Sequence, residues 1–289
     1  MTHRAGFVNL LGKPNAGKST LLNVLVGEKL AITSPKVQTT RHRILGIRTE
    51  SDYQMVFSDT PGIINPQYKL QEKMMGAVQT ALEDADVALI LMDARDEPGP
   101  LQALVAQLPI KAARILVINK CDLISSERLE AIKAAFTAKN WAAKIGISAL
   151  KQQHIEALLR IVVELLPEGP PFYPEDVLTD RPVRFFVSEL IREKVYSLFR
   201  DEVPYQTAVL IRQFEEKKTL TKISADIIVQ RQSQKGILLG EKGRSIKEIG
   251  SRARQDIERF LERKVFLELH VKVRAKWRDK DHFLKEYGY

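Results

Sequence analysis

Short apolar runs alternate with longer amphipathic stretches from residue 5 to about residue 166. The apolar runs predict strands at residues 6–11, 45–48, 54–58, 87–92, 114–118 and 144–147. The amphipathic stretches predict helices at residues 19–25, 70–82, 101–107, 127–139 and 155–166. Strands that alternate with helices favour right-handed crossovers, so this part of the chain is expected to form an α/β domain. Its sheet should be mostly parallel, with helices on both faces.

A proline-rich segment interrupts this pattern at Pro167, Pro170, Pro171 and Pro174, and it predicts a semi-rigid linker. Beyond it, a helix is predicted at residues 188–200, strands at 207–215 and 222–231, a helical pair at 235–263, a strand at 265–273 and a last helix near Trp277. The resulting α-β-β-α-α-β order indicates an α+β domain. We expect one domain over residues 1–170, a linker over residues 171–184 and a second domain over residues 185–289.

The composition is that of a folded protein from a reducing compartment. With 289 residues, 44% hydrophobic and 28% charged, the chain can form two hydrophobic cores. Its one cysteine, Cys121, excludes an internal disulfide framework. The apolar stretch at residues 5–11 is too short for a secretory signal, and no apolar run approaches the roughly 18 residues that span a bilayer. We therefore expect a cytoplasmic protein without a transmembrane segment. We also expect a monomer, although the composition does not bear on the oligomeric state.

The net charge of +9 is concentrated towards the end of the chain. Residues 171–289 hold 25 Lys and Arg against 19 Asp and Glu, whereas residues 1–170 hold 20 against 17. A basic surplus usually marks a solvated face, but it is also typical of a surface that binds a phosphate backbone. Charge alone does not decide between the two.

A glycine-rich loop lies between the first predicted strand and the first predicted helix. It matches the P-loop pattern G-x-x-x-x-G-K-[ST] with Gly12, Lys13, Pro14, Asn15, Ala16, Gly17, Lys18 and Ser19. In this motif the backbone N–H groups surround phosphates, Lys18 contacts the β and γ oxygens, and Ser19 offers a hydroxyl to Mg²⁺. We expect these residues and Thr20 to bind a nucleotide.

Three more loops, each after a predicted strand, indicate that the nucleotide carries guanine. They contain Asp59, Thr60, Pro61 and Gly62; then Asn119, Lys120 and Asp122; then Ser148, Ala149 and Leu150. Asp59 is expected to hold Mg²⁺ and the Gly62 amide to contact the γ-phosphate. Asp122 can only accept hydrogen bonds, which suits the N1–H and N2–H₂ edge of guanine, and the third loop offers a backbone amide to guanine O6. The first of these loops alone could be an ordinary Pro-Gly turn, and the third alone is almost uninformative; the ordered set is specific.

This ordered set resembles the translation-factor-related P-loop GTPases, and among them a bacterial GTPase of ribosome assembly. The resemblance covers essentially the whole chain, including residues 38–42, Pro204 and Tyr205. It implies GTP and GDP as ligands, Mg²⁺ as cofactor, and a Mg²⁺-binding switch threonine within residues 38–42. We favour Thr40 over Thr39 for that threonine, with a polar surface loop as the alternative.

One position departs from the Ras-type pattern. Ile63 follows the Asp59–Gly62 loop, where Ras-like enzymes place the glutamine that orients the attacking water. An isoleucine cannot donate or accept a proton, so intrinsic hydrolysis should be slow. The resemblance implies that Asn15 helps to bind K⁺ near the phosphates; the alternative is that Asn15 only caps the loop. Lys18, Asn15 and Thr40 are therefore the catalytic candidates.

A basic G-x-x-G segment lies between the two predicted helices of the second domain. The RNA-binding candidates in and around it are Gly236, Gly240, Glu241, Lys242, Gly243, Arg244 and Lys247. The α-β-β-α-α-β order matches the type II KH fold, which clamps about four nucleotides of single strand at such a loop. A helix–turn–helix core is the alternative for two glycines at this spacing.

For this domain the resemblance implies the single-stranded 3′ end of small-subunit ribosomal RNA as ligand and a role in assembly of that subunit. Lys272, Arg274, Lys276 and Arg278 extend the basic surface. Trp277 is expected in the core, with base stacking as the alternative, and anionic membrane is the alternative partner of the basic surface. Two rival functions remain. One is an RNA-binding module whose nucleotide site is only a structural or sensory element with negligible turnover, and the other is a P-loop kinase of a small metabolite. The guanine loop disfavours the kinase.

Overall fold

The computed structural model describes residues 2–34, 36–138 and 140–289. The chain divides into two compact units, which are described separately below. The first unit comprises Met1–Asn65 and Met74–Asp180, and the second comprises Pro66–Lys73 and Arg181–Tyr289.

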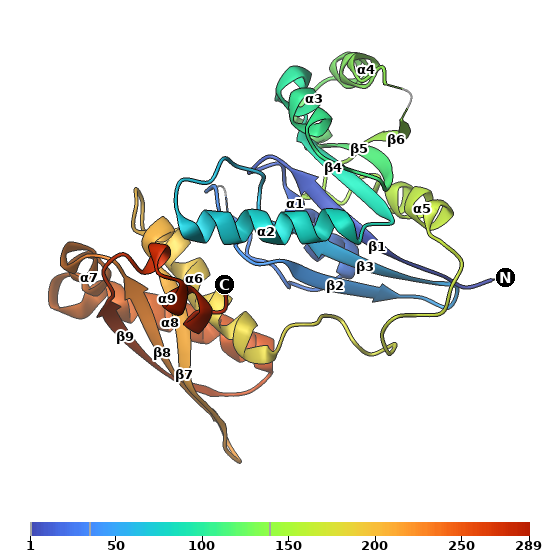
Figure 1. The fold of residues 1–289 in the computed structure, drawn as a ribbon. Helices are drawn as coiled ribbons and strands as arrows, with labels where there is room; N and C mark the ends of the chain where they lie inside the picture. The colour runs from blue at the N-terminus through green and yellow to red at the C-terminus, as the bar shows by residue number, and fades with distance from the viewer. Residues whose placement is uncertain (1, 35, 139) are drawn as a thin grey trace. The chain divides into compact units, whose positions relative to one another are not determined.

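The first unit contains a six-stranded sheet in the order β2-β3-β1-β4-β5-β6 (Figure 1). The strands are β1 (Arg4–Gly12), β2 (Ile44–Thr49), β3 (Tyr53–Asp59), β4 (Val87–Asp93), β5 (Ala113–Asn119) and β6 (Trp141–Gly146). Only the pairing of β2 with β3 is antiparallel, as expected for a hairpin, and the other four pairings are parallel. The prediction of a mostly parallel α/β sheet is therefore confirmed.

The helices of this part of the chain are α1 (Lys18–Val26), α2 (Lys69–Glu83), α3 (Pro98–Ala106), α4 (Ser126–Ala135) and α5 (Ile155–Leu165), with a 3₁₀ turn η1 (Cys121–Leu123). Helix α3 begins three residues before the predicted start because Pro98 fits a first helical turn, where its missing N–H costs no hydrogen bond. Helix α4 ends at Ala135, and the predicted end at Lys139 lies outside the described residues.

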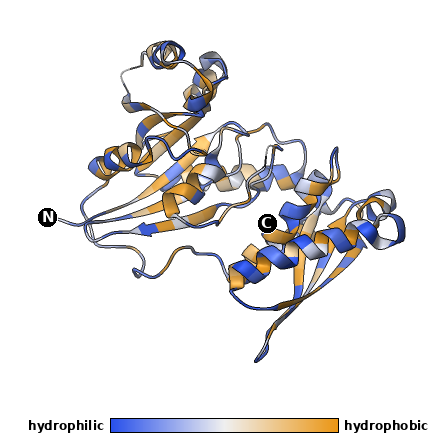
Figure 2. Cartoon of the chain, turned by 180° about the vertical axis from the view of Figure 1, so that it is seen from behind, coloured by the Kyte–Doolittle hydropathy of each residue, from blue (hydrophilic) through white to orange (hydrophobic). Residues whose placement is uncertain are grey.

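Burial explains why the central strands could be recognised as apolar runs. All seven residues of β4 are buried, because both faces of a parallel sheet are covered. Leu89 and Leu91 on β4 are fully buried, and so are Ile115 and Val117 on β5. In Figure 2 these strands are mostly orange (hydrophobic), whereas the helices carry both orange and blue (hydrophilic) residues. The carboxyl ends of these strands carry polar residues, and the loops with candidate chemistry begin there.

The segment predicted as a linker, residues 171–184, is partly fixed to the first unit. The Gln54 side chain is fully buried, and its Oε1 accepts from the amides of Phe172 and Tyr173 at 2.7 and 3.0 Å. The amide of Ile47 donates to Leu178 O at 2.8 Å. The predicted linker also ends two residues too late, since helix α6 begins at Val183, directly after an N-cap proline.

The second unit has a three-stranded sheet in the order β7-β8-β9. Strand β7 (Ala208–Glu216) is antiparallel to β8 (Thr221–Val229), and β9 (Val265–Val273) is parallel to β8. The helices are α6 (Val183–Leu198), α7 (Gln232–Leu239), α8 (Arg244–Leu261) and α9 (Asp281–Glu286), with 3₁₀ turns η2 (Pro204–Gln206), η3 (Glu241–Gly243) and η4 (Trp277–Asp279). From α6 to β9 the major elements follow the predicted α-β-β-α-α-β order.

The core of the second unit is a cluster of buried residues from α6, α7, α8 and the sheet, including Val187, Ile223, Leu238 and Ile249. Trp277 is fully buried outside this sheet–helix cluster, and its indole N–H donates to Gln206 O at 3.0 Å. Base stacking by Trp277 is therefore excluded in this conformation. Within the described residues, the helices are all too short or too polar to cross a bilayer.

Candidate functional site

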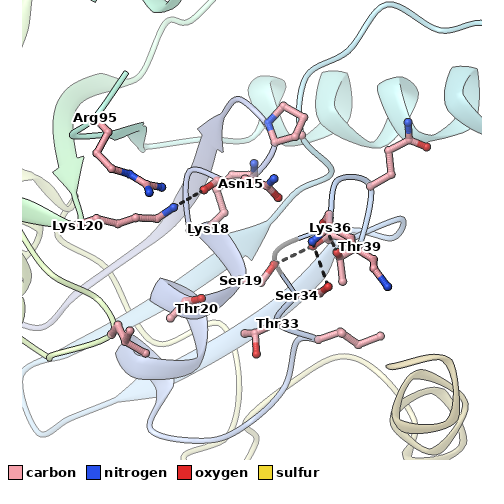
Figure 3. Close-up of a pocket in the computed structure, with 17 residues that line it drawn as sticks. Asn15, Lys18, Ser19, Thr20, Thr33, Ser34, Lys36, Thr39, Arg95 and Lys120 are labelled. Atoms are coloured by element: carbon pink, nitrogen blue, oxygen red, sulfur yellow. Dashed lines mark hydrogen bonds between the residues drawn. The ribbon is translucent and has the colours of Figure 1, made fainter. Parts of the chain in front are cut away.

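The predicted P-loop, switch and guanine loops surround one cavity of about 510 Å³ in the first unit (Figure 3). Lys18, Ser19, Thr40, Gly62, Lys120 and Leu150 are among the residues that line it. The volume is within the usual range for a small-molecule or cofactor site. The cavity lies at the carboxyl ends of the strands, where ligands bind in open α/β sheets.

Two glycines of the P-loop stand at positions where a side chain has no room. Gly12 has φ +148°, and a Cβ atom there would lie 2.4 Å from Leu91 O. Gly17 has φ +95°, and a Cβ atom there would lie 2.2 Å from Asn119 Nδ2. Because α1 begins at Lys18, the loop leads directly into a helix N-terminus, which favours an anion.

Lys18 is buried at the base of this loop, with 6% of its surface exposed. Its ammonium donates to Gly12 O at 3.1 Å and to Lys13 O at 3.0 Å. Burial lowers the pKa of Lys18 to about 8, and the nearby Asp59 carboxylate opposes that shift. The lysine is thus held inside the curve of the loop, where a phosphate group would receive its charge.

Three side-chain oxygens converge next to Lys18. Ser19 Oγ donates to Asp59 Oδ2 at 2.6 Å and lies 2.7 Å from Thr40 Oγ1, which donates to the same carboxylate oxygen at 3.3 Å. Asp59 is fully buried, and its Oδ1 atom has no hydrogen-bond partner. Burial raises the pKa of Asp59 to about 6, against the hydrogen bond from Ser19 and the charge of Lys18. A buried carboxylate with an unused oxygen beside two hydroxyls fits Mg²⁺, which takes oxygen ligands.

The neighbouring Thr39 is oriented differently. Its hydroxyl donates to Lys36 O at 2.7 Å, within its own loop. This arrangement supports Thr40 as the switch threonine. Thr60 is also turned away from the site, since its hydroxyl donates to Leu10 O at 2.9 Å and joins β3 to β1.

Asn119 joins three of the predicted loops. Its Nδ2 donates to Ala16 O in the P-loop at 2.9 Å, and its Oδ1 accepts from the amides of Lys120 and Ala149 at 2.9 and 3.0 Å. The Ala149 amide therefore donates within the protein, not into the cavity, in this structure. Asp122 and Leu150 are exposed at the same edge of the sheet.

Asn15 and Ile63 bear on how water could be positioned. Asn15 has φ +64° and lines the cavity, and its carbonyl accepts from Lys120 Nζ at 2.9 Å. Ile63 packs against the hydrophobic core cluster that contains Met92 and Ile118. An apolar, packed residue at this position supplies no hydrogen bond to an attacking water.

Two functional candidates were not predicted from the sequence. Asp93 Oδ2 accepts from Lys120 Nζ at 2.7 Å, and Arg95, which lines the cavity, donates to both oxygens of Asp93. A signal existed: Asp93 directly follows the strand predicted at residues 87–92, at the sheet edge where ligands bind. Asp93 is not part of any recognised sequence motif, so the sequence alone does not single it out.

The G-x-x-G segment of the second unit forms an open, basic turn between α7 and α8. Gly240 and Gly243 have φ values of +70° and +77°, and a Cβ atom at Gly240 would lie 2.2 Å from Ser245 Oγ. At Gly243 the nearest atom would be 3.9 Å away, so that position is sterically open. The charged residues here are all exposed: Glu241, Lys242, Arg244 and Lys247. Gly236 lies within α7, where a Cβ atom would meet nothing within 4 Å.

Comparison with known proteins assigns a family to each unit. Residues 7–120 match the family described as 50S ribosome-binding GTPase, and residues 202–278 match the KH domain family. GTPase Era of Geotalea uraniireducens (strain Rf4) is 45% identical over 290 residues, covering 99% of this chain and 98% of that protein. GTPase Era of Thermosipho melanesiensis is 45% identical over 291 residues, covering 99% and 97%.

Two solved structures match the whole chain. One is a crystal structure of Era in complex with MgGDPNP and nucleotides 1506–1542 of 16S ribosomal RNA, with a TM-score of 0.96, 39% identity and 99% coverage of both chains. The other is a variant of Aquifex aeolicus Era bound to GDP.AlF4–, with a TM-score of 0.95, 38% identity and 99% coverage of both chains.

Proposed function

The chain belongs to the Era family of GTPases, and from that premise we propose that it binds the 3′ end of small-subunit ribosomal RNA through its KH domain. The observation that carries this proposal is the open, basic Gly240–Gly243 turn, together with the 16S RNA fragment in the solved relative. The description of the first unit's family refers to the large subunit. We favour the small subunit because the RNA-bound relative matches over 99% of the chain.

The chain is a GTPase. Some of its residues would bind the phosphates and the guanine of GTP, and others would neutralise negative charge on the phosphates during hydrolysis. We propose that the P-loop amides and Lys18 hold the β- and γ-phosphates of GTP, while water attacks the γ-phosphate in line. Ser19, Thr40 and Asp59 would hold Mg²⁺, which neutralises charge on the phosphate oxygens. The Asp122 carboxylate would accept from the guanine edge, as its acceptor-only chemistry requires.

Potassium is a finer proposal for the same site. The apolar Ile63 leaves the reaction without a polar side chain at the water-orienting position. A cation beside the phosphates would therefore raise the hydrolysis rate more than it would in a site that has such a side chain. Asn15 is the proposed ligand, since it lines the cavity within the P-loop.

We further propose that the two ligands are linked. GTP would order residues 38–42 and the segment after Gly62, hydrolysis would release them, and the KH domain would hold RNA differently in the two states. The protein would work as a monomer in the cytoplasm, where its RNA partner is assembled. Contact of the basic surface with anionic membrane is the alternative use of the same charge.

The test is to crosslink the protein to RNA in its GTP-bound and GDP-bound states and to sequence the captured RNA. We expect crosslinks at the 3′ end of small-subunit RNA, with yields that differ between the two states. Crosslinks confined to large-subunit RNA would contradict the proposal. Sedimentation with vesicles that contain anionic lipid, with neutral vesicles as control, tests the membrane alternative.

A further inference from the structure

Asp93 ends strand β4 beside the nucleotide-binding loops but lies outside all of their motifs. Its side chain is 8% exposed and accepts from two cations. Lys120 Nζ donates to Oδ2 at 2.7 Å, and Arg95 donates to Oδ1 at 3.0 Å and to Oδ2 at 2.7 Å. Although burial acts to raise it, the hydrogen bonds from Arg95 and Lys120 hold the pKa of Asp93 well below its usual range. Asp93 is therefore a carboxylate at neutral pH.

Lys120 is held at both ends of its side chain. Its backbone has φ +65°, and its amide donates to Asn119 Oδ1 at 2.9 Å. Its ammonium donates to Asn15 O in the P-loop at 2.9 Å as well as to Asp93, and Figure 3 shows the side chain running along the cavity towards Asn15. A lysine stem is flexible on its own, so these acceptors determine where it lies.

We propose that Asp93 is a positioning residue of the nucleotide site, which holds the Lys120 ammonium against the P-loop so that the lysine stem forms a wall of the guanine-nucleotide cavity. This inference rests on the nucleotide-binding function proposed above and adds a residue to it. Arg95, whose side chain is 58% exposed, balances the charge of Asp93 from the solvent side. The role belongs to the carboxylate, because Asp93 is the side chain that both cations share.

A purely electrostatic role for Asp93 would have the opposite consequence. A carboxylate near phosphate-binding loops repels phosphates, so its removal would tighten nucleotide binding if charge were its only effect. If Asp93 positions Lys120, its removal frees the lysine, and bound nucleotide should dissociate faster. The sign of the change therefore separates the two roles.

The experiment measures the release of a fluorescent GDP analogue from the full chain by stopped flow, with excess unlabelled GDP. Asp93→Ala is expected to release the analogue about tenfold faster, as for the loss of one charge-assisted hydrogen bond. Lys120→Ala should also release it faster, and the double variant should match Lys120→Ala alone. Glu97→Ala is the matched control, because it removes a negative charge four residues further on that pairs with Arg128 instead. Its release rate should stay at the parent value.

Slower release from Asp93→Ala, or rate increases that add fully in the double variant, would overturn the proposal. If Asp93→Ala does not fold, Asp93→Asn removes the charge with less change in shape. It then replaces Asp93→Ala in the comparison of the single and double variants. A parent protein that does not bind the GDP analogue would instead contradict the nucleotide function itself. The two failures are therefore distinguishable.

Discussion

The amide nitrogen of Asn119 donates to the carbonyl of Ala16 across 2.9 Å, and this bond joins the guanine loop to the P-loop. The same side chain accepts from Lys120 and Ala149, so one buried amide sets the relative positions of three loops. Gly17 is required for it, since a Cβ atom at that position would collide with the amide group.

Replacement of Asn119 should therefore damage nucleotide binding as a whole. Asn119→Ala removes three hydrogen bonds and leaves buried backbone groups unpaired, each at a cost of about 1–3 kcal/mol. We expect GDP and GTP affinity to fall by more than about a hundredfold, measured by fluorescence titration. RNA binding by the nucleotide-free protein should stay within the error of the parent value, because Asn119 lies in the first unit. A variant with near-normal GDP affinity would contradict the bridging role.

Guanine specificity should depend on Asp122. Asp122→Asn replaces an acceptor with a mixed donor and acceptor, so preference should shift from GTP towards xanthosine triphosphate, whose C2 carbonyl accepts. Each charge-assisted hydrogen bond lost costs about 1.5–3 kcal/mol, or more than about tenfold in GTP affinity. Competition titrations with the two triphosphates measure the shift. Since Asp122 is exposed, thermal unfolding of the variant should match the parent, and unchanged GTP binding would remove this loop from the base site.

The two adjacent switch threonines should respond differently to loss of their hydroxyls. Thr40→Val removes an oxygen that lies 2.7 Å from Ser19 Oγ, whereas Thr39→Val removes a bond to Lys36 O within the loop. We expect Thr40→Val to raise the Mg²⁺ concentration for half-maximal GTP hydrolysis by about tenfold, as for one lost ligand contact. Thr39→Val serves as the matched control, and a larger effect from it would reverse the assignment.

Much of this site could be predicted from the sequence because its motifs have fixed spacing. The P-loop, the Asp59–Gly62 loop and the guanine loop follow β1, β3 and β5, and such largely buried strands are easily recognised as apolar runs when both sheet faces are covered. The sequence favours Thr40 over Thr39 only through the family resemblance, since adjacent identical residues have the same pattern, and the different hydrogen bonds of the two hydroxyls support that choice. Asp93 was missed because a lone carboxylate has no spacing to recognise.

The linker shows a different limit. Prolines predict an end of the first domain at residue 170, whereas the first unit extends to Asp180. The hydrogen bonds from the amides of residues 172 and 173 to Gln54 depend on a partner more than a hundred positions earlier in the chain. Local sequence does not report such a partner. The sequence predicts a helix from residue 188, whereas α6 begins at Val183, because the apolar run Phe185, Phe186 and Val187 lacks the polar spacing of an amphipathic helix.

Turnover should depend on K⁺ through Asn15. We expect faster GTP hydrolysis in K⁺ than in Na⁺ at equal ionic strength, because a correctly sized cation beside the phosphates would offset charge that Ile63 cannot. Asn15→Ala should abolish the difference while retaining GDP affinity, since the contact from Lys120 is to the backbone carbonyl of residue 15. Phosphate release assays in the two salts measure this. Equal hydrolysis rates of the parent protein in the two salts would contradict K⁺ binding by Asn15 and indicate that Asn15 is purely structural.

RNA binding should be separable from nucleotide binding at Gly243. This glycine is sterically open but has φ +77°, a backbone conformation that Asp and Asn tolerate better than other side chains. Gly243→Asp places a negative charge where a phosphate backbone is proposed to lie, and Gly243→Asn adds nearly the same bulk without the charge. Gly240 is unsuitable for this test, because any side chain there would collide with Ser245.

We expect Gly243→Asp to bind a single-stranded RNA of the small-subunit 3′ end at least about tenfold more weakly than Gly243→Asn, measured by fluorescence anisotropy. Affinity of the parent should fall steeply with salt, because Lys242, Arg244 and Lys247 would displace counterions from the RNA. GDP affinity should be unchanged in both variants, since the P-loop and the guanine loop belong to the other unit. If the aspartate and asparagine variants both bind RNA as the parent does, the Gly240–Gly243 turn is not an RNA-binding loop. Its basic residues would then be a solvated surface.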